Sequence, residues 1–115
     1  MFNNTLRNRI AENKTCYGVI SSTTDPTVCE YLGLMGLDFY IIDGEHGAIT
    51  LTEATHMIRA MENVGIAALA RVRSLDEKLI LQYLDAGVMG IMMPGTETPS
   101  RSEEHTSELQ SRVDI

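Results

Sequence analysis

Short apolar runs alternate with segments of helical periodicity along most of this chain. The runs read as strands at residues 17–20, 39–42, 66–72 and 90–93. Between them, apolar residues recur every three or four positions, which is typical of helices with one buried face. A short polar helix is also predicted at residues 5–13, with Leu6 and Ile10 as its apolar pair. The pattern therefore predicts strands that alternate with helices.

Each of the three longer helices carries its own start and stop signals. Asp25 and Pro26 suit a helix N-cap and the first helical position. The stretches 50–53 (Thr-Leu-Thr-Glu) and 74–77 (Ser-Leu-Asp-Glu) have the capping-box form, and a glycine follows each helix. The face predicted for the first of these helices consists of Val28, Tyr31, Leu32 and Met35.

Strands that alternate with helices indicate a parallel sheet with right-handed crossovers. Two architectures use this order, an open doubly wound sheet and a barrel of eight units. The phosphate-binding G-x-G-x-x-G is absent after the first predicted strand, which weakens a dinucleotide-binding open sheet or an open-sheet regulatory domain. A full barrel takes about 250 residues, so if the fold is a barrel, this chain contains about half of it.

Size and charge narrow the class of protein. With 115 residues, 43% hydrophobic and 22% charged, the chain has the composition of one soluble domain. Its net charge of −7 argues against nucleic-acid binding. Since it lacks a transmembrane-length apolar run and a signal pattern, we expect a cytoplasmic protein with no membrane partner. Cys16 and Cys29 are then expected to be reduced thiols.

The richest chemistry follows the second predicted strand. Four bulky apolar residues, 39–42, lead directly into Asp43, Glu45 and His46. In α/β folds the reactive groups sit just past the carboxyl ends of the strands. An imidazole beside two carboxylates suits proton transfer, and the same trio could bind a metal or form a loop without catalytic function.

Arg71 ends the third predicted strand, after an apolar run. A cation at that position is costly unless it is paired or faces the open end of the sheet. One interpretation is a structural ion pair with Asp43 or Glu45. The other is a fixed positive group directed at an anionic substrate or a developing oxyanion.

Three segments resemble the HpcH/HpaI aldolase/citrate lyase family: residues 36–47, the strand that ends in Arg71, and residues 84–94. The resemblance covers about residues 5–98. It implies the N-terminal half of a (β/α)₈ TIM barrel of the phosphoenolpyruvate/pyruvate superfamily, with about four parallel strands, three crossover helices and a short N-terminal helix. Residues 1–98 would form this truncated aldolase domain. Members cleave 2-oxo-4-hydroxy acids to pyruvate and an aldehyde with a divalent metal such as Mg, Mn or Co.

The resemblance also implies roles for individual residues. His46 matches the family's proton acceptor, and Arg71 matches the residue that binds substrate and stabilises the pyruvate enolate. Asp85 matches a carboxylate that raises the basicity of the histidine, although the predicted helix places it at the rim opposite the strand ends. From the residues themselves, and not from the resemblance, Asp43 and Glu45 are expected to assist His46 without reacting, because nearby negative charge strengthens an imidazole as a base.

The family's metal ligands come from later strands. The chain as given is therefore expected to bind no metal and to be inactive, whereas the full-length parent would be a homo-oligomer acting on 2-oxo acids. Two alternatives stay open: a non-catalytic half-barrel that self-associates, and a fragment of a related acyl-CoA or citrate lyase.

The chain changes character past Thr98. Residues 101–111 resemble the forward translation of a common sequencing-library adapter. We therefore expect residues 99–115 to be a disordered, non-native tail, and His105 to belong to no site.

Overall fold

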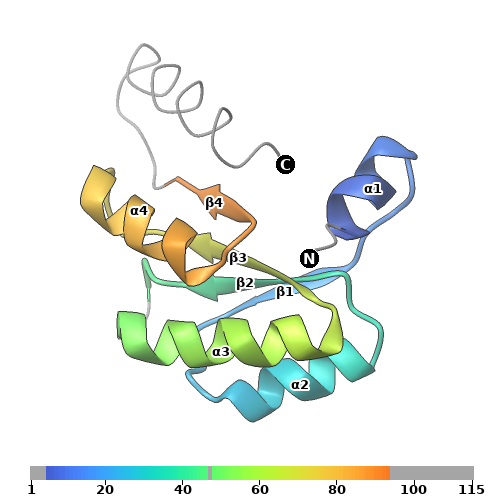
Figure 1. Cartoon of the computed structure of the whole chain (residues 1–115), viewed down its shortest axis with the longest axis horizontal. Helices are drawn as coiled ribbons and strands as arrows, with labels where there is room; N and C mark the ends of the chain where they lie inside the picture. The colour runs from blue at the N-terminus through green and yellow to red at the C-terminus, as the bar shows by residue number, and fades with distance from the viewer. Residues whose placement is uncertain (1–4, 47, 94–115) are drawn as a thin grey trace.

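A computed structural model of the chain describes residues 5–46 and 48–93. In chain order, its elements are α1 (Thr5–Ala11), β1 (Gly18–Ser21), α2 (Pro26–Leu34), β2 (Phe39–Asp43), α3 (Leu51–Val64), β3 (Ala67–Arg71), α4 (Glu77–Ala86) and β4 (Gly90–Met92) (Figure 1). These are the helices and strands that the sequence predicts. No helix in this part of the chain is long and apolar enough to cross a bilayer. The predicted tail, residues 99–115, lies outside the described residues.

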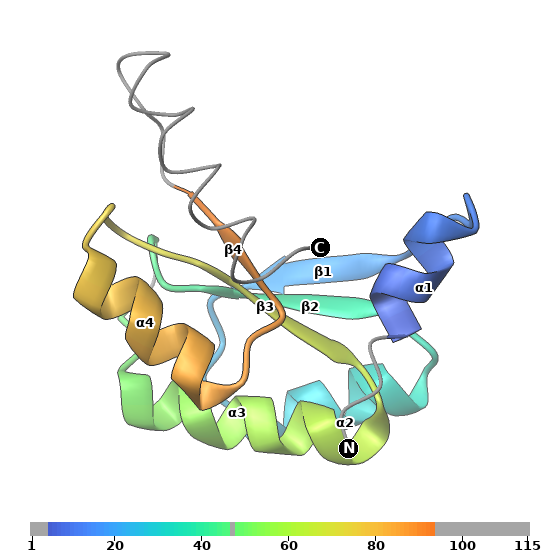
Figure 2. The ribbon, with the colours of Figure 1, turned by 45° about the horizontal axis from the view of Figure 1, so that its top comes forward.

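The four strands are parallel and lie in the order β1-β2-β3-β4. A doubly wound sheet would reverse its strand order and carry helices on both faces. Here the buried residues of α2, α3 and α4 form one cluster with a single face of the sheet (Figure 2). A sequential strand order with the crossover helices on one side is barrel geometry. The predicted N-terminal part of a (β/α)₈ barrel is therefore favoured over the open sheet.

The core lies between the crossover helices and the sheet. Tyr40 and Ile42 of β2 point into it, because alternate residues of a strand face the same side. Helix α3 covers them with a buried stripe made of Ala54, Met57, Ile58 and Met61. The opposite face of the sheet is less covered: Ile20 is 46% exposed and Met92 is 43% exposed. In a complete barrel this face points inward.

Two of the predicted helix starts are confirmed. The Asp25 carboxylate caps α2 by accepting a hydrogen bond from the Thr27 N–H at 2.9 Å. At the start of α3, the Thr50 hydroxyl accepts from the Glu53 N–H at 3.1 Å, and the Glu53 carboxylate accepts from the Thr50 N–H at 3.0 Å. This reciprocal pair is the capping box that the sequence predicts, and it fixes where the chain turns after β2.

The predicted capping box of α4 is wrong in position. Its N-cap is Asp76, whose carboxylate accepts from the Lys78 N–H at 3.0 Å, and not Ser74. The reason lies in the preceding strand: the Val72 N–H still bonds to the Met92 carbonyl at 3.2 Å. The chain therefore needs the following residues to reverse direction before a helix can begin.

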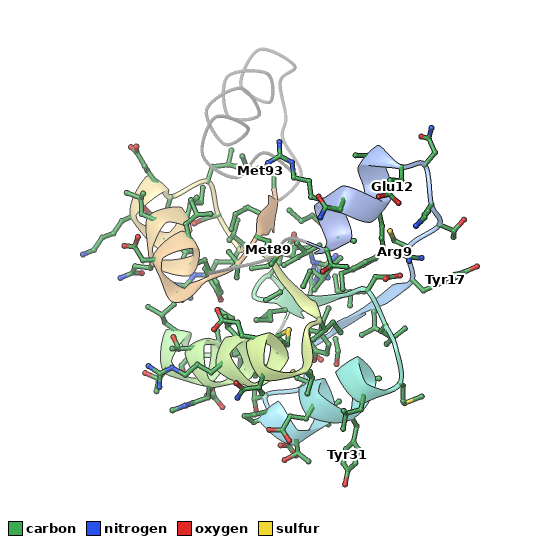
Figure 3. The ribbon with its side chains drawn as sticks, turned by 45° about the vertical axis from the view of Figure 1, so that its right-hand side comes forward. Arg9, Glu12, Tyr17, Tyr31, Met89 and Met93 are labelled. Carbon is green, nitrogen blue, oxygen red and sulfur yellow. The ribbon has the colours of Figure 1, made fainter. Side chains whose placement is uncertain are left out.

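The predicted apolar face of α2 is also wrong for three of its four residues. Tyr31 is 66% exposed and Met35 is 77% exposed, and Val28 is exposed as well; Figure 3 shows Tyr31 pointing away from the sheet. The helix instead packs through Cys29 and Leu32. Periodicity alone did not separate these overlapping faces.

Helix α1 lies at the amino ends of the strands (Figure 1). Of its predicted apolar pair, Leu6 is buried and Ile10 is exposed. The helix is held by an ion pair between Arg9 and Asp38 at 3.1 Å. The other oxygen of Asp38 accepts from the Tyr17 N–H at 2.9 Å, so one carboxylate joins α1 to the starts of β1 and β2.

Candidate functional site

The candidate site is built at the carboxyl ends of β2 and β3. Asp43 and Arg71 are the last residues of these strands and pair with each other in register. Because their neighbours Ile42 and Ala70 face the helices, Asp43 and Arg71 face the other side, which is the inner side of a barrel. The turn after β2 then brings His46 back over the pair.

The Asp43 carboxylate is almost completely buried and carries several hydrogen bonds. Arg71 donates from Nε to Oδ1 at 3.2 Å and from Nη2 to Oδ2 at 2.8 Å. The backbone N–H groups of Glu45 and His46 also donate to Oδ1, at 3.1 and 2.9 Å. The Arg71 guanidinium and these N–H groups lower the pKa of Asp43 from 3.8 to about 2, against the opposing effect of burial. Asp43 therefore holds both the arginine and the loop.

His46 lies against the same arginine. Its Nδ1 is 2.7 Å from Nη2 of Arg71 and 3.8 Å from Oδ2 of Asp43. Its Nε2 is 3.7 Å from Oε1 of Glu45, whose other oxygen is 3.5 Å from Nε of Arg71. The imidazole is 63% exposed, so this base stays open to solvent and to small solutes.

The structure thus brings together Asp43, Glu45, His46 and Arg71. The ion pair that the sequence offered as one interpretation of Arg71 is present, with Asp43 as the nearer partner. The pair does not use up the guanidinium, because Nη1 makes no hydrogen bond within the described residues. A structural role and an anion-binding role for Arg71 are therefore compatible.

Asp85 is not part of this cluster. It is exposed in the last turn of α4, two residues before Gly87, which lies against Glu62 in the last turn of α3. The helix end and the strand ends are on opposite rims of the sheet, as expected from the sequence. Helix α4 continues to Ala86, so an early helix end does not bring Asp85 closer to His46.

Sequence reasoning did not assign a role to Gly44 or Tyr83. The Gly44 N–H donates to the Arg71 carbonyl at 2.8 Å, and a Cβ on Gly44 would lie 2.9 Å from both that oxygen and the Tyr83 hydroxyl. Only glycine permits this approach, which fixes the end of β2 against β3. Behind it, an open hollow of about 380 Å³ is lined by residues that include Thr50, Arg73 and Tyr83. The glycine directly after Asp43 was the available sequence signal.

The described residues do not fit a divalent metal. No group of three or more His, Cys, Asp or Glu side chains within residues 5–46 and 48–93 is arranged to hold one. Both oxygens of Asp43 already accept hydrogen bonds from Arg71. A guanidinium that also contacts His46 would repel a cation placed among these three side chains.

Comparison with known proteins identifies relatives over most of the chain. The profile of the HpcH/HpaI aldolase/citrate lyase family matches residues 17–114. A hydroxypyruvate/pyruvate aldolase of Deinococcus radiodurans is 29% identical over 101 residues, which are 88% of this chain and 36% of that protein. A 5-keto-4-deoxy-D-glucarate aldolase of Escherichia coli is 27% identical over 104 residues, which are 90% of this chain and 41% of that protein. The chain thus spans about two fifths of the length of these curated relatives.

Solved structures show the same correspondence. The citrate synthase SbnG superposes with a TM-score of 0.83 at 32% identity, over 90% of this chain and 42% of that one. An HpcH/HpaI aldolase from Desulfitobacterium hafniense superposes with a TM-score of 0.82 at 27% identity, over 90% of this chain and 40% of that one. These matches confirm that the four strands and their helices form part of a TIM-barrel-like fold. The adapter-like stretch, 101–111, lies within the profile match but outside the described residues.

Proposed function

The chain belongs to the HpcH/HpaI aldolase/citrate lyase family, and from that premise we propose that it is the N-terminal part of a metal-dependent class II aldolase. The parent enzyme would cleave 2-oxo-4-hydroxy acids to pyruvate and an aldehyde. The observation that carries this proposal is the contact of His46 with the Arg71–Asp43 pair at the carboxyl ends of β2 and β3. Two aldolases among the relatives support the same reaction class.

Arg71 would bind the 2-oxo acid and stabilise the enolate. Carbon–carbon cleavage leaves negative charge on the pyruvate oxygen, and a guanidinium held in advance can stabilise that charge without reorganising. Asp43 holds Arg71 by two hydrogen bonds, while Nη1 has no partner within the described residues. The arginine is therefore fixed along one edge and available along another.

His46 would take the proton from the substrate's 4-hydroxyl group, directly or through water. It is exposed at the strand ends and near two carboxylates, where a base can reach a bound small molecule. Asp43 and Glu45 would position His46 and Arg71. Asp85 lies at the other rim, so we propose that it could raise the basicity of His46 only through contact in an assembled oligomer.

The catalytic metal would be held elsewhere. The described residues offer no site for it, and the family resemblance assigns its ligands to later strands of the parent. When bound, such an ion would share the charge of the enolate with Arg71. We therefore propose that the 115-residue chain as given neither binds this metal nor cleaves the substrate.

The test compares two proteins, the 115-residue chain and the product of the reading frame amplified from source DNA beyond the codon for Thr98. Pyruvate release from 4-hydroxy-2-oxo acids is measured with Mg²⁺, Mn²⁺ or Co²⁺. We expect turnover from the longer product and none above the blank from the shorter chain. The same amplification tests the adapter hypothesis, which is wrong if genomic codons continue through residues 101–111. Turnover by the 115-residue chain would refute the proposed inactivity.

A second candidate is a fragment of a related citrate- or acyl-CoA-handling enzyme. The specific observation in its favour is the superposition on the citrate synthase SbnG, at 32% identity. The longer product separates the two candidates. Release of free thiol from acetyl-CoA with oxaloacetate, without pyruvate release from any 4-hydroxy-2-oxo acid, would favour the citrate synthase reaction.

A third candidate is a half-barrel that self-associates without catalysis. The apolar residues Ile20 and Met92 are exposed on the inner sheet face, and β1 and β4 each have one edge that no other strand within residues 5–46 and 48–93 pairs with. Exposed edges and apolar faces promote association. Sedimentation of the purified 115-residue chain tests this candidate, and a compact monomer counts against it.

A further inference from the structure

The contact between Arg71 and His46 determines which imidazole nitrogen can act as a base. A guanidinium carries only N–H donors and has no acceptor. Nη2 of Arg71 lies 2.7 Å from Nδ1 of His46, so Nη2 donates and Nδ1 accepts. The proton of a neutral His46 is then on Nε2, which points toward Glu45 at 3.7 Å. In this state, the basic lone pair of His46 is already engaged.

The two edges of the Arg71 guanidinium are occupied differently. Nε–H and one Nη2–H form the first edge, and Asp43 accepts from both of them. Nη1–H and the other Nη2–H form the second edge. His46 covers the Nη2 half of this edge, and Nη1 makes no hydrogen bond within the described residues. The second edge is the remaining place where an anion with two oxygens can bind in the bidentate geometry that guanidinium favours.

Such an anion and Nδ1 of His46 compete for the same Nη2–H. Oδ2 of Asp43 is 3.8 Å from Nδ1, just outside hydrogen-bond distance, so a ring released from Nη2 can turn Nδ1 toward it. Oδ2 accepts a single hydrogen bond from Arg71, whereas Oδ1 accepts three from Arg71 and the two backbone N–H groups. Each carboxylate oxygen has two lone pairs, so Oδ2, with a single donor, has capacity for an Nδ1–H donor.

We propose that a two-oxygen anion, a carboxylate or a 2-oxo acid, displaces His46 from Arg71 and thereby switches the tautomer of His46. One proton leaves Nε2 to water and one enters Nδ1 from water, so the protonation state of the protein does not change. The imidazole is exposed enough for this exchange. Nε2 then presents a free lone pair while Nδ1–H is held by Asp43. Arg71 is thus a positioning residue for His46, and His46 becomes a base only after the acid has bound.

This inference rests on the proposed function for its substrate class, but its test needs no catalysis. Long-range ¹H–¹⁵N spectra of imidazoles distinguish a protonated nitrogen from an unprotonated one. The chain has three histidines, and His46→Gln identifies the His46 signals by their loss. Spectra of the 115-residue chain are recorded at about pH 9, where histidines are ordinarily neutral. In the free chain we expect Nε2–H as the major tautomer, and a major Nδ1–H form would overturn the inference.

The second step adds oxalate, a dianion whose two carboxylates can each present a pair of oxygens to a guanidinium, with chloride at equal ionic strength as the control. We expect oxalate, and not chloride, to move His46 to the Nδ1–H form. The inference is also overturned if oxalate shifts the Arg71 Nε–H signal while the tautomer stays the same, or if oxalate leaves both signals unchanged.

A matched pair of variants isolates the arginine. Arg71→Met removes the donor and is expected to give the Nδ1–H tautomer without any anion. Arg73→Met removes the same charge two residues away and should leave the wild-type spectrum. If Arg71→Met does not fold, the oxalate experiment on the wild-type chain still decides.

The outcomes for this inference and for the proposed function are separate. If the 115-residue chain shows the tautomer switch but the longer product releases no pyruvate, the inference stands and the aldolase assignment is refuted. Pyruvate release by the longer product, together with Nδ1–H in the anion-free chain, would remove the inference alone.

Discussion

The helix-covered face of β2 and the carboxyl end of the same strand are stabilised in different ways. On the covered face, Tyr40 and Ile42 pack against α3 in a cluster of buried apolar residues. At the rim, one residue further along, Asp43 is buried as a charge and needs Arg71 and two backbone N–H groups to be stable there. Packing stabilises the first region, whereas the second region keeps ionised groups at positions where a solute can reach them.

The largest effect is expected from the covered face. Met57→Ala removes a side chain that is completely buried between α3 and the sheet, and should lower the free energy of unfolding by about 2–5 kcal/mol. Met35→Ala, at an exposed position, should change it by less than about 0.5 kcal/mol. Urea denaturation measures both variants, and equal losses would mean that this face is not the core.

At the carboxyl end of β2, the contribution to stability should depend on pH, because it comes from an ionised carboxylate and not from apolar packing. Hydrogen bonds from Arg71 lower the pKa of Asp43 from 3.8 to about 2 in the folded chain. A lowered pKa stabilises the fold above the unfolded value, and this contribution is lost as the pH falls from about 4 to about 2. Unfolding by urea across that range should show a smaller loss in Asp43→Asn than in the wild type. An equal loss of stability in the wild type and in Asp43→Asn would contradict the conclusion that the Asp43 carboxylate stabilises the fold.

Smaller effects on the free energy of unfolding are expected at the helix starts, where the sequence predicted the cap of α3 correctly and the cap of α4 incorrectly. Thr50→Ala removes the cap of α3 and Asp76→Ala removes the cap of α4, each at a cost of about 1 kcal/mol in unfolding free energy. Ser74→Ala should cost almost nothing, because Asp76 caps α4. If urea denaturation shows a larger loss of unfolding free energy for Ser74→Ala than for Asp76→Ala, Ser74 caps α4 as the sequence predicted.

Local signals in the sequence were enough for most of the fold. Apolar runs, caps and glycines specify elements through neighbouring residues, so the strands, the Asp25 cap and the Thr50–Glu53 box could all be predicted. The face of α2 could not, because both Val28–Tyr31–Met35 and Cys29–Leu32 have helical spacing. Which face is buried depends on where α3 lies, and that is a property of the tertiary fold.

The site divides in the same way. The register between β2 and β3 brings Asp43 and Arg71 together, so a pair of strand-end residues could be anticipated from the sequence alone. The role of Gly44 could not, because it depends on the Arg71 carbonyl and the Tyr83 hydroxyl, which come from distant segments. Nor could the sequence show that His46 meets Arg71 through Nδ1, since this depends on the turn at residues 44–46.

The most direct test of the account is pyruvate release by the longer product of the amplified reading frame. With a divalent metal and a 4-hydroxy-2-oxo acid, we predict that the wild type releases pyruvate, that His46→Ala and Arg71→Met abolish release, and that Arg73→Met retains it. Pyruvate release that survives both His46→Ala and Arg71→Met would contradict the claim that this rim is the reactive site.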